Sequence, residues 1–529
     1  MNSNRRLFLK QAGMTAMGAG LLAHFPIELY GESPVKFSLP RSSPEKQGTS
    51  SSGILTFLEG IEKSKIEFHS IMIVRHGQVI AEGWWAPYVS TAKHTLYSLS
   101  KSFTSSAVGM AIAEKHLTLE SPVISFFPND LPAVVSANLA AMKVKHLLTM
   151  ATGHAKDTIP DLRNGSVSHW AKAFLAIPVE FEPGSQFVYN TGATYILSTI
   201  LQKTTSKPLL QYLKPRLFDP LGMEDIDWET NPEGINTGGY GLRLRTEDVA
   251  KFGQLYLQKG LWKPKQIIPA AWVADATASH IESHPAKVKR PKEEDDWSQG
   301  YGYQFWRCRH GAYRGDGAFG QFCVVLPEQD AVVVITGESF DLDASLDLVW
   351  SHILPAMTKG ELPADTLAQG KLEEKLKRLV LDPPKLNTSS LMAENLSGKV
   401  FTLEPNDFIA KSISFTFVDN ACIFRVTHEK TEHQVIAYTN NWLITEKFKT
   451  QMLFPMNGRP EVTTSLAASI TWQDDHTLIM TLRYTETAHS DRITFAFIGN
   501  KVTISFLNSV SSGNPESAEK RPTLYGMMV

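Results

Sequence analysis

The sequence predicts an α+β protein: an antiparallel sheet flanked by helices, a helical subdomain beside that sheet, and then a small all-β domain. Three patterns predict this fold class. Strand-like segments stand at both ends of residues 69–336, helical patterns fill the stretch between them, and period-two alternation dominates residues 391–529. With 529 residues, of which 43% are hydrophobic and 20% charged, the chain has the size and composition of two globular domains.

Strands begin and end the first domain, which we expect over residues 35–360. His69–Arg75 and Gln78–Trp85 predict two strands joined by a tight turn at His76-Gly77. Because strands from both ends of the domain must pair, they predict one antiparallel sheet. The later strands are predicted at Gly300–Trp306, Gly320–Leu326 and Ala331–Thr336.

Helices fill the middle of this domain. The stretch from Phe103 to about Gly239 is dominated by helical patterns and loops, which predicts a helical subdomain with the functional site between it and the sheet. Thr246–Gly260 is a clearly amphipathic helix that starts at a threonine and stops at a glycine. Its apolar positions are expected in the core: Val249, Phe252, Leu255 and Tyr256.

A charged linker is expected over residues 361–390, between the two domains. It contains the helical pattern Lys371–Leu381, which ends at Asp382-Pro383-Pro384 because proline cannot continue a helix. Beyond it, residues 391–529 predict the β-rich domain. Its clearest hairpin has alternating apolar residues on either side of a Gly499-Asn500 turn: Ile493, Phe495 and Phe497, then Val502, Ile504 and Phe506.

The N-terminal residues 1–31 have the layout of an export signal. Two adjacent arginines precede Phe8-Leu9-Lys10, as in a twin-arginine signal, and a mildly apolar stretch follows over Gln11–Ala23. That stretch is shorter than the ~20 apolar residues that a membrane span requires. We therefore expect a periplasmic protein of a bacterium, with no transmembrane span in the mature chain. The absence of a cysteine near the expected cleavage region argues against a lipoprotein.

Charge and cysteine content exclude several classes of protein. The net charge of −2 and a pI of about 6.8 leave no basic excess, so we expect no nucleic-acid partner. Three cysteines are too few for a disulfide framework; they are expected as buried apolar residues, with a bridge between Cys308 and Cys323 left open. No His, Cys, Asp or Glu cluster has metal-binding spacing, so no metal and no cofactor is expected.

Ser98 and Lys101 are the candidate nucleophile and base. They stand one helical turn apart at the start of an apolar helical run, and a desolvated lysine with a lowered pKa can take the proton of a serine hydroxyl. The alternative is an N-cap serine with a solvated first-turn lysine. Ser-x-x-Lys occurs five times, and only the Ser98 copy leads into an amphipathic helix: Ser33, Ser43, Ser90, Ser98 and Ser517.

Six segments follow one another in an order that a known family shares: Tyr97–Thr104, His146–Gly153, Glu182–Thr191, Gly238–Leu242, Glu247–Gly253 and Gly315–Gln321. On these segments, the chain from Ile71 to about Gly337 resembles the serine β-lactamase and penicillin-binding family. The resemblance is strongest to its class C-like branch of esterases, D-aminopeptidases and nylon-oligomer hydrolases. It implies a β-lactamase/transpeptidase-like fold, and other members carry a similar β-barrel-like domain after it.

The resemblance also implies roles for residues of the site. It makes Tyr189 a phenolate or proton shuttle, which suits a phenol only if cations such as Lys101 hold its pKa down. It assigns the N–H groups of Ser98 and Ala318 to an oxyanion hole, with Gly317 beside them. The alternatives are a core tyrosine at position 189 and, at the glycines, a tight turn into a strand.

Two positions depart from the family pattern. Tyr189-Asn190-Thr191 stands where Tyr-x-Asn is usual, so Thr191 offers a substrate a hydroxyl in place of an amide. Gly315-Asp316-Gly317 stands where Lys-Thr/Ser-Gly or His-x-Gly is usual, and Asp316 repels an anion. This argues against β-lactam hydrolysis. Nearby aromatic residues line an apolar cleft or belong to the core: Tyr301, Tyr303, Trp306 and Phe319.

Together these features predict an exported serine hydrolase that cleaves a small-molecule or peptide-like ester or amide through a Ser98 acyl-enzyme. Two alternatives stay open. One is a penicillin-binding or sensor protein whose acyl-enzyme persists, and the other is a binding protein of the cell envelope with a decayed site.

Overall fold

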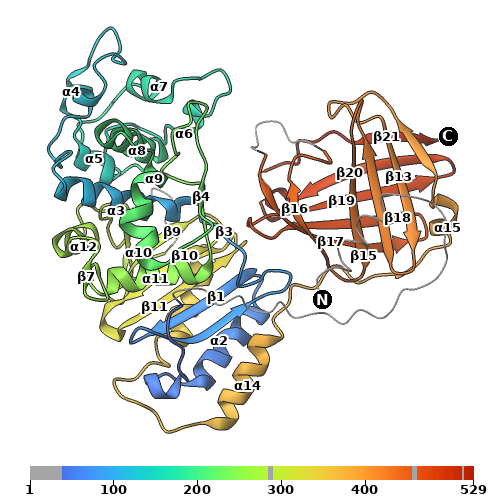
Figure 1. Cartoon of the computed structure of the whole chain (residues 1–529), viewed down its shortest axis with the longest axis horizontal. Helices are drawn as coiled ribbons and strands as arrows, with labels where there is room; N and C mark the ends of the chain where they lie inside the picture. Colours follow the sequence, from blue (N-terminus) through green and yellow to red (C-terminus); the bar gives the residue numbers. More distant parts are fainter. Residues whose placement is uncertain (1–37, 284–289, 455–460, 515–516) are drawn as a thin grey trace. The chain divides into compact units, whose positions relative to one another are not determined.

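The computed structural model describes residues 38–283, 290–454, 461–514 and 517–529. The expected export signal at residues 1–31 lies outside them. A six-stranded antiparallel sheet, in the order β2-β1-β11-β10-β9-β8, forms the centre of the first domain (Figure 1). Its strands are β1 (Phe68–Arg75), β2 (Gln78–Trp84), β8 (Trp306–Arg307), β9 (Tyr313–Gly317), β10 (Gln321–Leu326) and β11 (Ala331–Gly337).

The predicted joining of strands from both ends of the domain is confirmed, since β1 pairs with β2 on one side and with β11 on the other. The turn between β1 and β2 has positive φ at both His76 (49°) and Gly77 (74°), which matches the right-handed twist of a hairpin. The strand predicted at Gly300–Trp306 is wrong in all but its last residue. Positive φ angles at Gly300 (100°) and Gln304 (65°) interrupt the extended backbone there.

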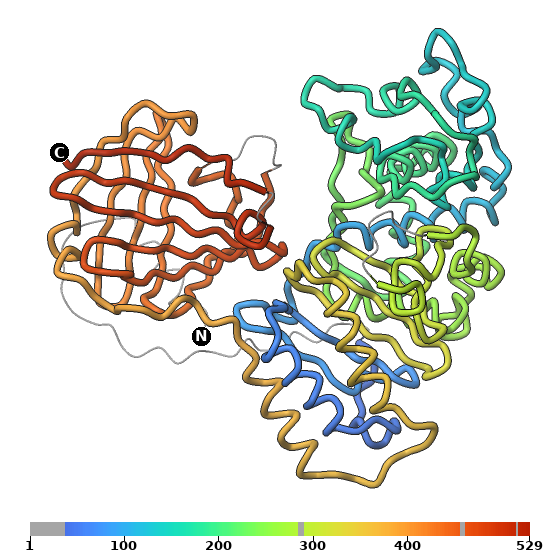
Figure 2. The backbone as a smooth tube through the Cα atoms, turned by 180° about the vertical axis from the view of Figure 1, so that it is seen from behind, coloured from blue at the N-terminus to red at the C-terminus, as the bar shows by residue number. Residues whose placement is uncertain are grey.

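Helices cover both faces of the sheet. On one face lies α11 (Thr246–Leu257), the predicted amphipathic helix, with all four of its expected core residues buried. On the other face α2 (Ser51–Lys63) and α14 (Thr366–Lys377) run side by side, as Figure 2 shows from behind. The charged helix α14 belongs to this layer, because its Leu372 is buried in the same core as α2. Alternate sheet residues therefore enter two separate cores.

The helical subdomain lies between β2 and α11 in the sequence. Its centre is the packing of α3 (Ser100–Ala113) against α8 (Thr191–Thr205), both of them largely buried. The short helices of the subdomain are α4 (Ala137–Ala141), α5 (Val144–Leu148), α6 (Ile159–Leu162), α7 (Trp170–Ala176), α9 (Leu209–Leu213) and α10 (Asp219–Leu221), and its short strands are β3 (His94–Thr95), β4 (Asp227–Trp228) and β5 (Leu242–Leu244). After α11 follow β6 (Leu261–Trp262), β7 (Lys265–Gln266) and α12 (Ala270–Ala276), and after β11 follows α13 (Leu342–Leu348), which packs with α2.

The C-terminal part is a β-barrel, which confirms the predicted all-β domain. Ten strands follow one another by antiparallel pairing, and a parallel pairing of β15 with β17 closes the sheet on itself. The predicted hairpin is confirmed as β19 and β20, whose six alternating apolar residues are buried. The elements are α15 (Met392–Leu396), β12 (Val400–Leu403), β13 (Ser412–Val418), β14 (Ala421–Thr427), β15 (Glu432–Thr439), β16 (Leu443–Lys449), β17 (Thr463–Asp474), β18 (Thr477–Tyr484), β19 (Ser490–Ile498), β20 (Lys501–Asn508), α16 (Ser509–Gly513) and β21 (Leu524–Met528).

Two further expectations bear on this fold. Cys308, Cys323 and Cys422 are buried free thiols, so the bridge left open between Cys308 and Cys323 is not formed. Among the residues that the structure describes, no helix combines the length and the apolar character needed to cross a bilayer.

Two helical glycines give a matched test of the packing. A Cβ on Gly109 of α3 would lie 2.4 Å from ring atoms of Trp272, whereas a Cβ on Gly370 of α14 meets nothing within 4 Å. We expect Gly109→Ala to lower the free energy of unfolding by about 1–3 kcal/mol through overpacking. Gly370→Ala is expected to raise it by about 0.5–1 kcal/mol through helix propensity. Urea denaturation followed by tryptophan fluorescence measures both, and equal stability of the two variants would contradict this packing.

Candidate active site

Ser98 lies in the 3₁₀ turn η2 (Tyr97–Leu99), which leads directly into α3. This turn places its side chain one helical turn from Lys101, and Lys101 Nζ lies 2.9 Å from Ser98 Oγ. Lys101 is only 1% exposed, so the alternative of a solvated lysine is wrong. The N-cap alternative is also wrong, because α3 is capped at Leu99 with no side-chain hydrogen bond.

The Lys101 amine has three polar neighbours. Besides Ser98 Oγ they are the Gly239 carbonyl oxygen at 2.9 Å and Thr191 Oγ1 at 3.2 Å. A neutral amine has two N–H groups and one lone pair. The carbonyl and the Thr191 hydroxyl can accept the two N–H groups, which leaves the lone pair for the Ser98 hydroxyl proton. The geometry is therefore that of a base directed at a nucleophile.

Burial also puts the lysine in the required protonation state. Desolvation lowers the pKa of Lys101 from 10.5 to about 7, and the carboxylates of Asp157 and Asp316 oppose this shift. The burial effect wins because the amine is almost completely removed from water. A large fraction of Lys101 is therefore neutral at physiological pH and able to accept a proton from Ser98.

Tyr189 completes the group around Ser98. Its hydroxyl hydrogen-bonds with Ser98, and the Lys101 amine lies 4.8 Å from the centre of its ring. The condition for a phenolate, a pKa held down by cations such as Lys101, is not met. Burial raises the pKa of Tyr189, and the hydrogen bond to Ser98 opposes the rise only in part. Tyr189 is therefore a neutral phenol, which can donate or relay a proton but does not act as a standing phenolate.

The start of α8 explains the departure at Thr191. Thr191 is the first residue of α8, and its N–H donates to Asp157 Oδ1 at 2.8 Å. Its hydroxyl faces the lysine, which is a different contact from the predicted one with the substrate. The neighbouring Asn190 is buried and accepts hydrogen bonds from the Thr158 backbone and hydroxyl, so its amide holds the loop. No sequence motif singles out Asp157.

Two glycines let strand β9 approach the turn that carries the nucleophile. A Cβ on Gly315 would lie 2.1 Å from Leu99 Cδ1, and one on Gly317 would lie 2.2 Å from the Leu96 carbonyl oxygen. Only glycine fits there. The two positions belong to β9 itself, and the alternative of a tight turn into a strand is present just after them, at residues 318–320 before β10. Ala318, the predicted second oxyanion donor, follows directly after this contact.

Asp316 is paired with a residue that no sequence motif singles out. The Arg314 guanidinium donates from Nε to Asp316 Oδ2 at 2.8 Å, and the Arg314 side chain is 0% exposed. The Arg314 guanidinium also lies over the rings of Trp297 and Trp306, 4.4 and 5.7 Å from their centres. The Asp316 charge, expected to repel an anion, is thus compensated in large part. Arg314 is too buried to bind a substrate carboxylate in its place.

The four candidate cleft aromatics have three different positions. Trp306 stacks on Tyr189 with ring centres 5.6 Å apart, and Tyr301 meets Tyr189 edge-on at 6.3 Å. Tyr303 packs on Trp272 in the main core, away from Ser98. The fourth, Phe319, packs against Tyr97, the residue before Ser98.

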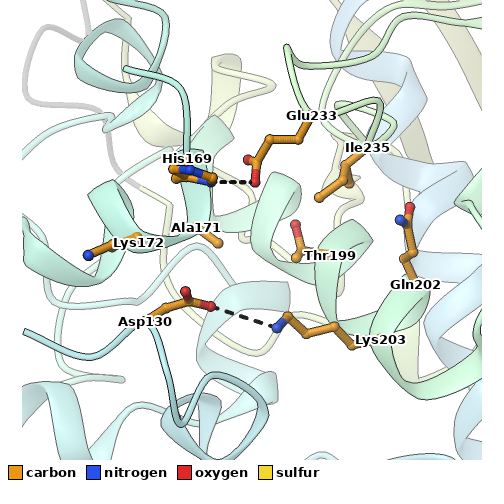
Figure 3. A pocket seen from close by; sticks show the side chains of 9 residues that line it. All are labelled: Asp130, His169, Ala171, Lys172, Thr199, Gln202, Lys203, Glu233 and Ile235. Atoms are coloured by element: carbon orange, nitrogen blue, oxygen red, sulfur yellow. Dashed lines mark hydrogen bonds and ion pairs between the residues drawn. The ribbon is translucent and has the colours of Figure 1, made fainter. Parts of the chain in front are cut away.

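A separate cavity of about 240 Å³ lies in the helical subdomain (Figure 3). Two ion pairs border it, Lys203–Asp130 at 3.7 Å and His169–Glu233 at 3.0 Å. None of the predicted site residues lines it. Its lining residues are Asp130, His169, Ala171, Lys172, Thr199, Gln202, Lys203, Glu233 and Ile235. Within the described part of the chain, no group of three or more His, Cys, Asp or Glu side chains could hold a metal ion.

Comparison with known proteins defines the class. The Beta-lactamase family matches residues 59–354, more than half of the chain, and the chain belongs to this family of serine hydrolases. Esterase EstB of Burkholderia gladioli is 25% identical over 178 residues, which cover 29% of this chain and 45% of EstB. The 6-aminohexanoate-dimer hydrolase of Paenarthrobacter ureafaciens is 22% identical over 281 residues, covering 50% and 71% of the two chains.

A solved structure of the octameric penicillin-binding protein homologue from Pyrococcus abyssi is 16% identical to this chain. The match covers 90% of this chain and 99% of the homologue, with a TM-score of 0.45. The matched region spans less than half the length of EstB. The family assignment rests on the match over residues 59–354, and the reaction of this chain is a separate question.

The lowered pKa of Lys101 predicts a pH dependence for acylation of Ser98. Below about pH 7 the lysine is protonated and cannot act as a base, so the acylation rate should fall close to tenfold per pH unit and level off above that value. Lys101→Arg stays protonated and should remove this inflection, with a rate at least 100-fold lower. Lys93→Arg is the matched control, because Lys93 belongs to the Ser90 copy of the motif and is held in ion pairs with Asp225 and Asp227. An unchanged profile in Lys101→Arg would contradict the role of Lys101 as base.

Proposed function

We propose that this protein is a hydrolase that cleaves an ester or an amide through an acyl-enzyme on Ser98. The observation that carries the proposal is the buried Lys101 amine, 2.9 Å from Ser98 Oγ, with its pKa lowered to about 7. A serine hydroxyl needs such a base because it is a poor nucleophile on its own. Tyr189 hydrogen-bonds with the same hydroxyl, and β9 packs against the turn that carries it, which supports a proton relay and an oxyanion site there.

The steps follow from these positions. Ser98 Oγ bonds to the substrate carbonyl carbon while its proton passes to Lys101, and the carbonyl oxygen becomes an oxyanion between the N–H groups of Ser98 and Ala318. The bond to the leaving group then breaks, and the leaving oxygen or nitrogen takes a proton relayed from Lys101 through the Tyr189 hydroxyl. In deacylation a water oxygen bonds to the acyl carbon while the water proton passes to Lys101 along the same route. The bond between that carbon and Ser98 Oγ then breaks, Oγ takes the proton back from Lys101, and the acid is released.

The charges near Ser98 favour a substrate with no carboxylate on its acyl part. Arg314, a cation on β9 itself, is fully buried and held by Asp316. Lys101 is engaged by three neighbours and is partly neutral. EstB is named for an esterase activity and the second relative for hydrolysis of an amide dimer, so both bond types are represented among relatives. We propose neutral esters and amides as the substrate class.

Export of the mature protein is the second part of this proposal. It rests on the twin-arginine-like pattern at residues 1–31. Fractionation of the producing cells should place the protein in the periplasm with these residues removed, and a full-length cytoplasmic protein would contradict this part.

Covalent labelling tests the nucleophile. A fluorophosphonate should add once to the wild-type protein, as intact-mass analysis measures. The adduct should disappear in Ser98→Ala and persist in Ser90→Ala, because Ser90 is an exposed Ser-x-x-Lys serine. A folded wild-type protein that takes up no adduct would overturn the hydrolase proposal.

Turnover distinguishes the proposed enzyme from its alternatives. We expect wild-type protein to release p-nitrophenol from a neutral acetate or butyrate ester with a kcat/KM at least 100-fold above that for the carboxylate-bearing β-lactam nitrocefin. Ser98→Ala should be inactive on both. Stable labelling by a β-lactam without product release would instead identify a penicillin-binding or sensor protein, and faster hydrolysis of nitrocefin would overturn the substrate class.

A further inference from the structure

Two residues with strained backbones flank the expected oxyanion site. Tyr97 directly precedes Ser98 and has a φ of 47°, and Phe319 directly follows Ala318 and has a φ of 64°. Bulky L-residues rarely adopt such angles, which persist only where surrounding contacts enforce them. The orientation of the two expected N–H donors therefore depends on what holds Tyr97 and Phe319.

The side chains of these two residues meet on one histidine. The rings of Tyr97 and Phe319 lie 5.2 Å apart, edge to face. The ring of His489 lies 4.9 Å from that of Phe319 and 5.9 Å from that of Tyr97, again edge to face. His489 Nε2 also hydrogen-bonds with the Tyr97 hydroxyl. One side chain thus contacts both strained residues.

His489 comes from the barrel, in the turn between β18 and β19. Its Nδ1 lies 2.6 Å from Glu338 Oε1, at the end of β11, and Glu338 is 4% exposed and also accepts from Ser509. Because a carboxylate only accepts, Nδ1 carries the proton of the hydrogen bond to Glu338, while Nε2 bonds the Tyr97 hydroxyl. The imidazole is held from both ends.

The backbone of the same turn is tied to the segment before Ser98. The Thr95 N–H donates to the Glu486 carbonyl at 3.0 Å. Arg243, on β5 beside β3, bonds the Glu486 carboxylate at 3.3 Å and the Thr463 carbonyl at 3.1 Å. The barrel turn therefore reaches the nucleophile segment through both backbone and side chain.

We propose that His489 is a positioning residue of the active site: through Tyr97 and Phe319 it fixes the two N–H groups that stabilise the oxyanion. The inference rests on the proposed function, since it concerns the oxyanion of that reaction. It makes the C-terminal barrel a structural part of the active site. His489 does not touch the reacting atoms, so it acts on the rate through geometry alone.

Steady-state kinetics on the neutral p-nitrophenyl ester test this proposal with the full-length protein. We expect His489→Ala to lower kcat at least tenfold with KM changed less than threefold and the pH inflection near 7 retained. Tyr97→Phe removes the same hydrogen bond from the other side and should show the same pattern. The double variant should lose little more than either single variant, because both act through one contact. His476→Ala, an exposed histidine of another barrel turn, is the matched control.

A readout without turnover accompanies the kinetics. Hydrogen–deuterium exchange of the peptide over residues 95–100 should speed up in His489→Ala and stay unchanged in His476→Ala. A kcat within twofold of wild type in His489→Ala, or losses that multiply in the double variant, would overturn the positioning role. A wild-type protein that neither labels nor turns over would instead overturn the proposed function, and this inference with it.

Discussion

The removal of the Lys101 amine from water is the constraint on which the site depends. A buried ammonium is costly, and the helix α3 places this amine where a carbonyl, a threonine hydroxyl and a serine hydroxyl are its polar neighbours. The neutral form fits that environment, and a neutral lysine is the form that can accept a proton. Burial thus lowers the pKa of Lys101 until the amine can act as a base near neutral pH. Ser98, Thr191 and Tyr189 all lie next to this amine.

Close approach of backbone segments is the second requirement of the site. Strand β9 reaches the nucleophile turn only because Gly315 and Gly317 lack side chains at the contact with Leu99 and Leu96. The same region holds Tyr97 and Phe319 at positive φ. The backbone near Ser98 is therefore both closely packed and strained. Local strain of this kind is kept by its surroundings, which here include a turn of the C-terminal barrel.

The charge that a substrate meets at the site depends on how the charged side chains are paired, and not on each charge taken alone. Asp316, taken alone, looks like a barrier to anions, but the buried Arg314 beside it compensates most of that charge. Asp157 caps the start of α8 and stands near Lys101. The two described cations that meet this group, Lys101 and Arg314, are both buried, which is the physical basis for proposing neutral substrates.

Periodicity and motif order were enough to predict the sheet with strands from both ends of the domain, the amphipathic helix that begins at Thr246, the β19–β20 hairpin, and the pairing of Ser98 with Lys101. These features depend on local alternation or on spacing of a single helical turn. Asp157, Glu338 and His489 could not be predicted, because they meet the site from distant parts of the sequence. Arg314 stands two residues before Asp316, but only the fold shows that its side chain is buried and paired with that carboxylate. The choice between a phenolate and a neutral proton shuttle at Tyr189, left open by the sequence, likewise depends on burial. Spacing determined which groups could react, whereas burial and long-range contacts, which exist only in the folded chain, decided their pKa values and orientation.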